Sequence, residues 1–345
     1  MHRRYRAAWL AAVFACAGIA HAEQHVTSGP EIDYQPAILK SSDDGARIVV
    51  FERLDPSSLF GDLWITRSID GGDTWSEPAA IVATGANERH PALVQTGASQ
   101  YALLYLKGMS AATSFPIFRA TSSDGVAFAE QAQIDLGWPT GGEINPHVVR
   151  HADGTLTMSY QRLGSGAGVY VAESTDDGVT WDTLQTQIAV SAQLPRIAFR
   201  ESDGLYLATY QTGGTSLHMF VKTTTNVHDW SAPPQDFAVT GNNHDSLPVV
   251  MPDDAFVVFF IRASGNQFDI ALRRSTDGSD WSQAQAVTDT PDANDVEPHP
   301  LVGDSPGRVE LYWGREQPVD SLTHDIVREP SVVVSEGIFT GSFDG

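Results

Sequence analysis

Three sets of residues recur about every fifty positions along this chain, and this internal repeat constrains the fold more than any other feature. The first set consists of prolines at intervals of 49 to 55 residues: Pro36, Pro91, Pro146, Pro195, Pro248 and Pro298. A short apolar run follows nearly every proline. Because proline lacks an amide donor, it is tolerated at the first residue of a strand. Each proline is therefore predicted to open a strand.

The second set is an apolar segment that contains an aromatic residue and lies roughly 15 residues after each proline. These segments are 48–51, 102–105, 156–160, 206–210, 256–260 and 309–312. Turns rich in Asp and Gly, such as Asp153-Gly154, precede several of them. Such turns join antiparallel strands, so each segment is predicted to pair with the strand that its proline opens.

The third set is the Asp box, Ser-x-Asp-x-Gly-x-Thr-Trp. It is complete at 68–75 and 174–181, one residue short at 275–281, degenerate at 122–128 and only a remnant at 224–230. A strand before and a strand after each box bring the count to four per repeat. We predict an all-β fold, a six-bladed β-propeller of four-stranded antiparallel blades with Asp-box hairpins, and keep a solenoid as the alternative.

These repeats resemble the BNR/Asp-box repeats of the sialidase superfamily. The resemblance implies that each box is a hairpin between the third and fourth strands, whose carboxylate caps turn amides and whose Trp packs between blades. Local chemistry agrees, because Asp side chains bond to nearby backbone amides and Gly accepts a positive φ. Six box residues are therefore predicted to be structural: Asp70, Asp176, Asp277, Trp75, Trp181 and Trp281.

The first 22 residues have the pattern of a secretory signal peptide. Three arginines precede an apolar run from Ala7 to Ala20, and Ala20-His21-Ala22 supplies small residues at the cleavage positions. We predict a signal peptide at 1–22, a single propeller domain at 23–345 and a secreted or periplasmic location. Lipidation of Cys16 is the less favoured alternative.

The net charge of −22 argues against a nucleic-acid partner, which requires a basic surface. No later segment approaches the 18 apolar residues of a membrane span. We expect a monomer without a cofactor. Histidines permit a metal site, but no His-x-x-x-His spacing supports one, so none is predicted.

Cations recur where the second strand of each repeat is predicted to end. The positions two residues past the aromatic residue are Arg53, Lys107, Arg162, Thr212 and Arg262, and Arg315 stands three past Tyr312. Guanidinium groups bind carboxylates through paired hydrogen bonds, so this rim is predicted to bind an acidic glycan or a small anion. The alternative is that these cations pair with neighbouring acids such as Glu52 and Glu316.

Polar residues also gather where the first strands begin, which is the same rim. The residues before the prolines are Gln35, His90, Asn145, Leu194, Leu247 and Glu297, and close to them stand Arg89, Glu143, His147, Arg196, His244, Asp245 and His299. Polar groups around a propeller axis are the default site, with His90, Asn145 and Glu297 as ligand-binding residues.

The resemblance to sialidases also implies catalytic roles. Glu143 matches the Glu that assists the nucleophile, Asp55 or Asp62 the acid/base, and Arg53, Arg162 and Arg262 the carboxylate clamp. Two elements depart from the family, since Gln35 stands where a clamp arginine is expected and no Tyr nucleophile occurs at 292–299.

Two classes of function therefore remain open. The first is a glycoside hydrolase-like enzyme for an acidic glycan, with a lyase acting through His90 or His299 as a variant. The second is a non-catalytic propeller that binds a glycan or a protein.

Overall fold

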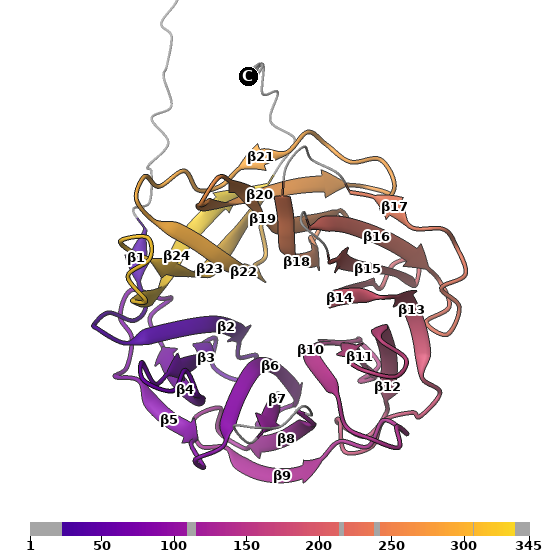
Figure 1. Ribbon diagram of the computed structural model, residues 1–345, viewed down its shortest axis with the longest axis horizontal. Helices are drawn as coiled ribbons and strands as arrows, with labels where there is room; N and C mark the ends of the chain where they lie inside the picture. The colour runs from indigo at the N-terminus through magenta and orange to yellow at the C-terminus, as the bar shows by residue number, and fades with distance from the viewer. Residues whose placement is uncertain (1–22, 109–114, 214–216, 238–241, 306, 335–345) are drawn as a thin grey trace, which may run out of the picture.

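The computed structural model describes residues 23–108, 115–213, 217–237, 242–305 and 307–334. Every regular element in these ranges is a β-strand, and the strands form sheets arranged radially around a common centre (Figure 1). The predicted signal peptide at 1–22, with Cys16, lies outside the described residues. No helix within these ranges is long and apolar enough to cross a membrane.

Four antiparallel sheets have four strands each, in chain order from the centre outward. We number these four-stranded units 2 to 5. Unit 2 comprises β6 (Asn87–Gly97), β7 (Gln100–Gly108), β8 (Ile117–Ser122) and β9 (Ala129–Gln133). Unit 3 comprises β10 (Glu143–Arg150), β11 (Leu156–Arg162), β12 (Gly168–Ser174) and β13 (Thr186–Val190). Unit 4 comprises β14 (Ala192–Arg200), β15 (Leu205–Thr212), β16 (His218–Thr224) and β17 (Gln235–Asp236). Unit 5 comprises β18 (Asn242–Val250), β19 (Phe256–Ser264), β20 (Gln267–Ser275) and β21 (Gln285–Ala286).

The fifth sheet has eight strands and contains both ends of the described chain. Unit 1 comprises β2 (Ile32–Lys40), β3 (Arg47–Leu54), β4 (Gly61–Ser68) and β5 (Ala79–Val82). Unit 6 comprises β22 (Asn294–Val302), β23 (Arg308–Glu316), β24 (His324–Val333) and β1 (Gln24–His25), which pairs with β24. One parallel residue pair, Ile32 with His324, joins these two units.

Each innermost strand carries a bulge near its start. The first bulge residue has a left-handed φ between 46° and 56° in all six units: Gln35, His90, Asn145, Leu194, Asp245 and Glu297. Proline follows in five units, so it lies in the bulge inside the strand and does not open the strand, as had been predicted; in unit 5 the bulge residues are Asp245 and Ser246. The prediction based on Pro248 was therefore displaced by two residues, because strand pairing and not proline sets the bulge. Six non-glycine residues in this strained backbone conformation surround the centre, and such strain is typical of functional sites.

Apolar side chains pack mainly between neighbouring units. Trp75 meets Tyr312 with ring centres 6.1 Å apart, Trp281 meets Phe237 at 4.9 Å, and Trp181 is buried in the cluster between units 2 and 3. These contacts confirm that the Asp-box tryptophans are structural. Large aromatic rings buried at such seams contribute much of the apolar contact between sheets.

The Asp-box carboxylates stabilise their own turns. Asp70 accepts hydrogen bonds from the Thr74 amide at 3.0 Å and the Ser68 hydroxyl at 2.7 Å. The amide of Gly72, whose φ is 94°, donates to Ser68 at 2.8 Å. Hydrogen bonds from Thr74, followed by that from Ser68, lower the pKa of Asp70. The predicted structural role of these residues is confirmed.

Candidate functional site

The rim cations face acids on the first strand of their own unit. The four opposed pairs, called the rim pairs below, are Asp33 with Arg53, Glu88 with Lys107, Glu143 with Arg162 and Asp295 with Arg315. Arg315 is in register with the others, which makes Trp313 and not Tyr312 the equivalent aromatic residue of unit 6. The pairing of rim cations with neighbouring acids, the alternative in the sequence analysis, therefore describes these four positions.

Two rim pairs have forked geometry. Arg53 donates from Nε and Nη2 to the Asp33 carboxylate at 2.6 and 2.8 Å. Arg315 donates to Asp295 at 2.6 and 2.9 Å and also pairs with Glu23. The partners anticipated from the sequence bind elsewhere, since Glu52 pairs with Arg89 at 2.8 Å and Glu316 accepts from Asn294 at 2.7 Å.

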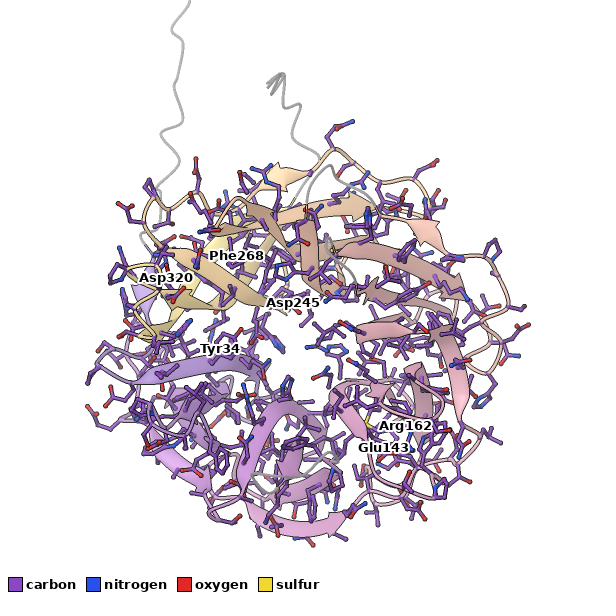
Figure 2. The ribbon with its side chains drawn as sticks, viewed as in Figure 1. Tyr34, Glu143, Arg162, Asp245, Phe268 and Asp320 are labelled. Atoms are coloured by element: carbon purple, nitrogen blue, oxygen red, sulfur yellow. The ribbon has the colours of Figure 1, made fainter. Side chains whose placement is uncertain are left out.

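Glu143 and Arg162 lie beside each other in unit 3, away from the centre of the ring (Figure 2). Arg162 is only 2% exposed and forms an ion pair with Glu143, while its Nη1 also donates to the Thr140 carbonyl at 2.7 Å. The guanidinium and the carboxylate thus satisfy each other in the interior of the unit. Neither lines the central cavity, which contradicts the expectation that Arg162 helps to hold an axial ligand.

The other residues implied by the sialidase resemblance do not line the cavity either. Asp55 is exposed and binds Ser57 and Ser58, and hydrogen bonds from these serines lower its pKa to about 2. Burial raises the pKa of Asp62. Arg262 is exposed and stands opposite Asp269 on the neighbouring strand. The proposed clamp of Arg53, Arg162 and Arg262 comes from second strands, which lie one strand outside those that surround the axis.

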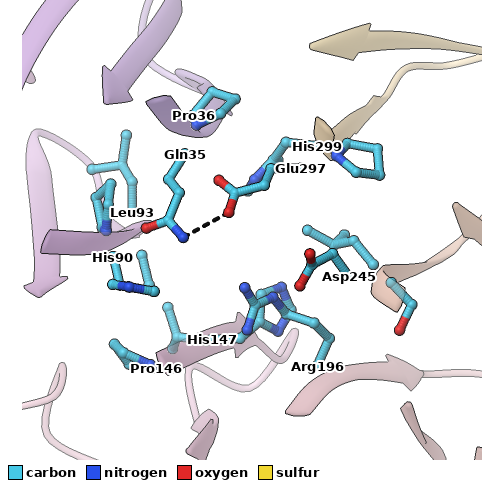
Figure 3. Close-up of a pocket in the computed structure, with 16 residues that line it drawn as sticks. Gln35, Pro36, His90, Leu93, Pro146, His147, Arg196, Asp245, Glu297 and His299 are labelled. Atoms are coloured by element: carbon cyan, nitrogen blue, oxygen red, sulfur yellow. Dashed lines mark hydrogen bonds between the residues drawn. The ribbon is translucent and has the colours of Figure 1, made fainter. Parts of the chain in front are cut away.

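The innermost strands instead enclose a small cavity on the axis, of about 80 Å³ (Figure 3). We call this space the axial cavity. The polar part of its wall consists of Gln35, His90, His147, Arg196, Asp245, Ser246, Glu297 and His299. His90 and Glu297 were predicted site residues. Asn145 is absent from the wall, because it is 5% exposed and donates to Gln161 at 2.8 Å.

Glu297 is the most perturbed acid in the cavity. Its Oε1 accepts from Gln35 Nε2 at 2.7 Å, whereas its Oε2 is buried without a hydrogen-bond partner among the described residues. Burial, and then the charge of Asp245, raise the pKa of Glu297 well above that of an ordinary glutamate. Glu297 therefore keeps its proton to a higher pH than an ordinary glutamate does, as a general acid requires.

Asp245 supplies the second carboxyl group. His244 Nδ1 lies 2.8 Å from its Oδ2, and its backbone amide donates to Gln211 Oε1 at 3.0 Å. These contacts, together with its left-handed backbone, fix the carboxyl group at the cavity wall (Figure 3). Two carboxyl groups of different environment therefore face one small space.

Arg196 provides the cation of the cavity. Its Nη1 donates to the Pro195 carbonyl at 3.0 Å, and it forms no ion pair within 4.0 Å with any residue in the described ranges. Burial lowers its pKa, opposed by the charges of Asp245 and Glu297. Unlike the rim arginines, its guanidinium retains donors for an external anion.

Three histidines complete the wall. Burial is the main cause that lowers the pKa of His90, His147 and His299, with Arg196 adding to the effect, and the pKa of His299 falls to about 4. The Ile197 amide donates to His147 Nδ1 at 3.3 Å, which leaves the proton of a neutral ring on Nε2. At neutral pH the rings are uncharged hydrogen-bonding groups.

Arg196, His147 and Asp245 were recognised from the sequence only as polar neighbours, whereas His299 was also considered as the acting group of a lyase. Three of them, His147, Arg196 and His299, stand two residues after a left-handed bulge residue. This is the first position after the two bulge residues, where regular strand pairing resumes. This position could have selected them once the bulge was located. No group of three or more His, Cys, Asp or Glu within the described ranges is arranged to hold a metal ion.

A family model described as a BNR repeat-like domain matches residues 61–298, which is more than half of the chain. The chain belongs to the BNR repeat-like family. Solved structures extend the likeness of this BNR protein at the level of the fold. A protein of unknown function from Dyadobacter fermentans has a TM-score of 0.72 and 14% identity, over 89% of this chain and 96% of that one.

Two glycosidases share the fold of the BNR protein. Hadza microbial sialidase Hz136 has a TM-score of 0.66 and 15% identity, over 88% of this chain but 66% of the sialidase. The α-L-arabinanase of Penicillium chrysogenum has a TM-score of 0.65 and 15% identity, over 88% of this chain and 94% of that chain. No curated protein matches the chain. These identities demonstrate a common fold and leave the activity to be argued from the site.

Proposed function

We propose that this protein is a secreted carbohydrate-active hydrolase, built as a six-bladed propeller, whose reacting centre is the axial cavity. Units 1 to 6 would be the six blades, with β1 completing the last one. Location outside the cytoplasm follows from the signal-peptide pattern at 1–22.

The observation that carries the proposal is the state of Glu297. Glycoside hydrolysis requires a carboxylic acid that protonates the departing oxygen and a second carboxylate that acts as base or nucleophile. Glu297 has a raised pKa and an unbonded, buried Oε2 that faces the cavity with Asp245. We therefore assign Glu297 the role of the acid, and Asp245 supplies the second carboxyl group.

Arg196 supports an acidic glycan as the substrate class. The Arg196 guanidinium is partly buried and has unused donors, which suit short charge-assisted hydrogen bonds to a carboxylate. The small cavity admits the edge of one sugar, such as its carboxylate, and not a whole buried oligosaccharide. The remaining sugar units would lie outside the mouth of the cavity.

A non-catalytic binding protein is the second candidate. It is favoured by the narrow cavity and by the rim pairs, which neutralise cations that a sialidase-like clamp would need. In this case Arg196 and the neutral histidines would hold the acidic sugar without turnover.

A glycan-release assay separates the two candidates. The protein without residues 1–22 is incubated with uronate- and sialate-containing oligosaccharides, together with the variants Glu297→Gln and Asp55→Asn. Hydrolysis that is lost at least a hundredfold in Glu297→Gln and retained in Asp55→Asn supports an axial enzyme. Binding of an acidic oligosaccharide without release, weakened by Arg196→Gln, supports the binding protein. Turnover that is unchanged in Glu297→Gln contradicts the proposed mechanism.

A further inference from the structure

In units 1 to 3 a cationic side chain lies over an aromatic ring, and unit 4 has no equivalent cation. In those units the rim cation lies over a ring, with Arg53 Cζ 4.4 Å from the centre of Trp64, Lys107 Nζ 5.4 Å from Phe118 and Arg162 Cζ 4.5 Å from Trp138. Such stacking holds the cation and shields the ring from solvent. The equivalent residue of unit 4 is Thr212, opposite Ala192. Both the cation and its acid partner are therefore replaced by small residues.

The aromatic pair beneath this position is retained. Tyr210 and Phe220 are opposed on β15 and β16, with ring centres 5.7 Å apart and planes 21° apart. The corresponding pair in unit 3, Tyr160 and Tyr170, has nearly the same geometry, 5.7 Å and 22°. Phe220 is only partly buried. Unit 4 thus presents a stacked aromatic pair without the cover found in unit 3.

The length of the preceding connection explains the missing cover. The segment 134–142 between β9 and β10 carries Trp138, which packs on Tyr170 at 5.2 Å and donates from Nε1 to the Tyr160 hydroxyl at 3.1 Å. Between β13 and β14 only Ser191 intervenes. A connection of one residue has no side chain that reaches the aromatic pair, so the space above it stays open.

This space is a cavity of about 390 Å³ between units 3 and 4, called the unit-4 pocket, and residues of β13, β15 and β16 line it. Figure 1 labels these strands. Its wall includes Gln187, Val190, Tyr210, Thr212, Phe220 and Lys222. The volume lies within the range of ordinary small-molecule sites. The pocket is also near the outer rim of the strand ends, since Thr212 is the last residue of β15.

The charges around the unit-4 pocket select a neutral ligand. Among the described residues no acid lines it, and the ammonium group of Lys222 already donates to the carbonyls of Ile188 and Trp230 at 3.0 and 2.5 Å. Gln187 Nε2 donates to the Tyr170 hydroxyl at 2.7 Å, which leaves its Oε1 as an acceptor at the edge. An aromatic floor with a hydroxyl and an amide at its edge suits a ring that has an apolar face and hydroxyl groups around it.

We infer that the unit-4 pocket binds an uncharged sugar ring, which stacks on Tyr210 and Phe220 and forms hydrogen bonds with Thr212 and Gln187. This site is separate from the axial cavity and requires no catalysis there. A glycan bound at both sites would have its acidic sugar in the axial cavity and a neutral sugar in the unit-4 pocket.

Restoring the missing cation is the sharpest test. In saturation-transfer NMR of the protein without residues 1–22, with cellotriose, maltotriose and arabinotriose as separate probes, we expect at least one probe to bind. Thr212→Arg would place a guanidinium over Phe220, as in unit 1, and weaken that binding by about tenfold or more. Thr212→Ser, which retains the hydroxyl group, is the matched control and should bind as the original protein does.

Phe220→Leu provides a second test that adds no bulk to the pocket. It removes one stacking face and should also weaken the same probe by about tenfold, while thermal melting verifies that each variant is folded. Absence of binding by all three probes, or equal binding to Thr212→Arg and the original protein, overturns the inference.

The axial proposal fails or survives independently of this result. Glu297→Gln should leave neutral-probe binding unchanged, because Glu297 does not line the unit-4 pocket. Neutral-probe binding that depends on Thr212 and Phe220 in a protein without hydrolysis would retain this site and reject the hydrolase.

Discussion

Charged residues occur both at the rim and at the axis of this protein, but their hydrogen-bond and ion-pair partners differ. At the rim, Arg53, Arg162 and Arg315 each meet a carboxylate on the neighbouring strand. At the axis, Arg196 has no such partner in the described ranges, and Glu297 keeps a buried oxygen unbonded. Arginine number and register therefore do not identify a ligand site, whereas unsatisfied hydrogen-bonding capacity around a cavity does.

The difference has an energetic basis. A buried ion pair whose members satisfy each other stabilises the folded state relative to a single unpaired ion, and it offers nothing to a ligand. A buried guanidinium or carboxyl group left without a partner costs stability, which a bound molecule can restore. The following experiments test this contrast between rim and axis.

Removal of a rim cation should have the largest effect, and it should act on stability. Arg162→Ala leaves the Glu143 carboxylate buried without its partner, so we expect the free energy of unfolding to fall by about 3 to 5 kcal/mol. Urea titration followed by tryptophan fluorescence measures the change. The double variant Arg162→Met with Glu143→Leu should recover most of the loss. A loss below about 1 kcal/mol for Arg162→Ala would show that the pair is not effectively buried.

Removal of the axial cation should act on binding. Arg196→Gln removes charge-assisted hydrogen bonds worth about 1.5 to 3 kcal/mol each. Affinity for a uronate oligosaccharide, measured by calorimetry, should therefore fall roughly tenfold to hundredfold. Exposed Arg262→Gln is the comparison variant and should bind almost as the original protein does. Equal losses in both variants would reject the distinction between rim and axis.

The axial histidines should make stability depend on pH. The folded pKa of His299 is lowered to about 4 from an ordinary value of 6.5, so in this window the unfolded chain binds the proton and the folded protein does not. Stability should decline as the pH falls from 6.5 to 4, with a contribution of at most about 1.4 kcal/mol per pH unit from one group. Urea titrations at several pH values in this range give the free energy of unfolding at each pH. Its decline with falling pH should be less steep for His299→Gln than for the original protein. An identical slope would mean that His299 is hydrated and titrates normally.

The smallest effect is expected at an exposed Asp box. Asp70→Ala removes the acceptor for the Thr74 amide and should lower stability only slightly, because the carboxylate is exposed to solvent. Activity or ligand affinity should be unchanged. The shift in urea midpoint measures the cost, and a change in ligand affinity would connect the box to the site against our expectation.

The repeat permitted prediction of the sheets because its signals are local. A proline and an aromatic segment recur in all six units, and a complete or partial Asp box occurs in units 1 to 5; each marks a strand or a turn. The register of unit 5 was missed because Pro248 is a misleading marker there, and only strand pairing reveals that Asp245 occupies the bulge.

The site was predictable only in part. His90 and Glu297 were found because they precede prolines, whereas Arg196 and His147 were left as neighbours. Whether a charged side chain faces the axis or its own sheet depends on the strand that carries it and on the bulge backbone. Whether an arginine is already paired depends on residues twenty positions away, such as Asp33 for Arg53. Spacing alone gives neither answer.

The pairing of β1 with β24 places the two ends of the described chain in one sheet. Gln24 is in register with Arg328, although some three hundred residues separate them in sequence. Until that contact forms, the outer edge of β24 presents unpaired amides and carbonyls, which invite association with other chains. A polypeptide emerging from a ribosome or an export channel cannot complete this contact until β24 has emerged, some three hundred residues after β1. The protein is therefore most prone to aggregation while it folds, before β1 has paired with β24.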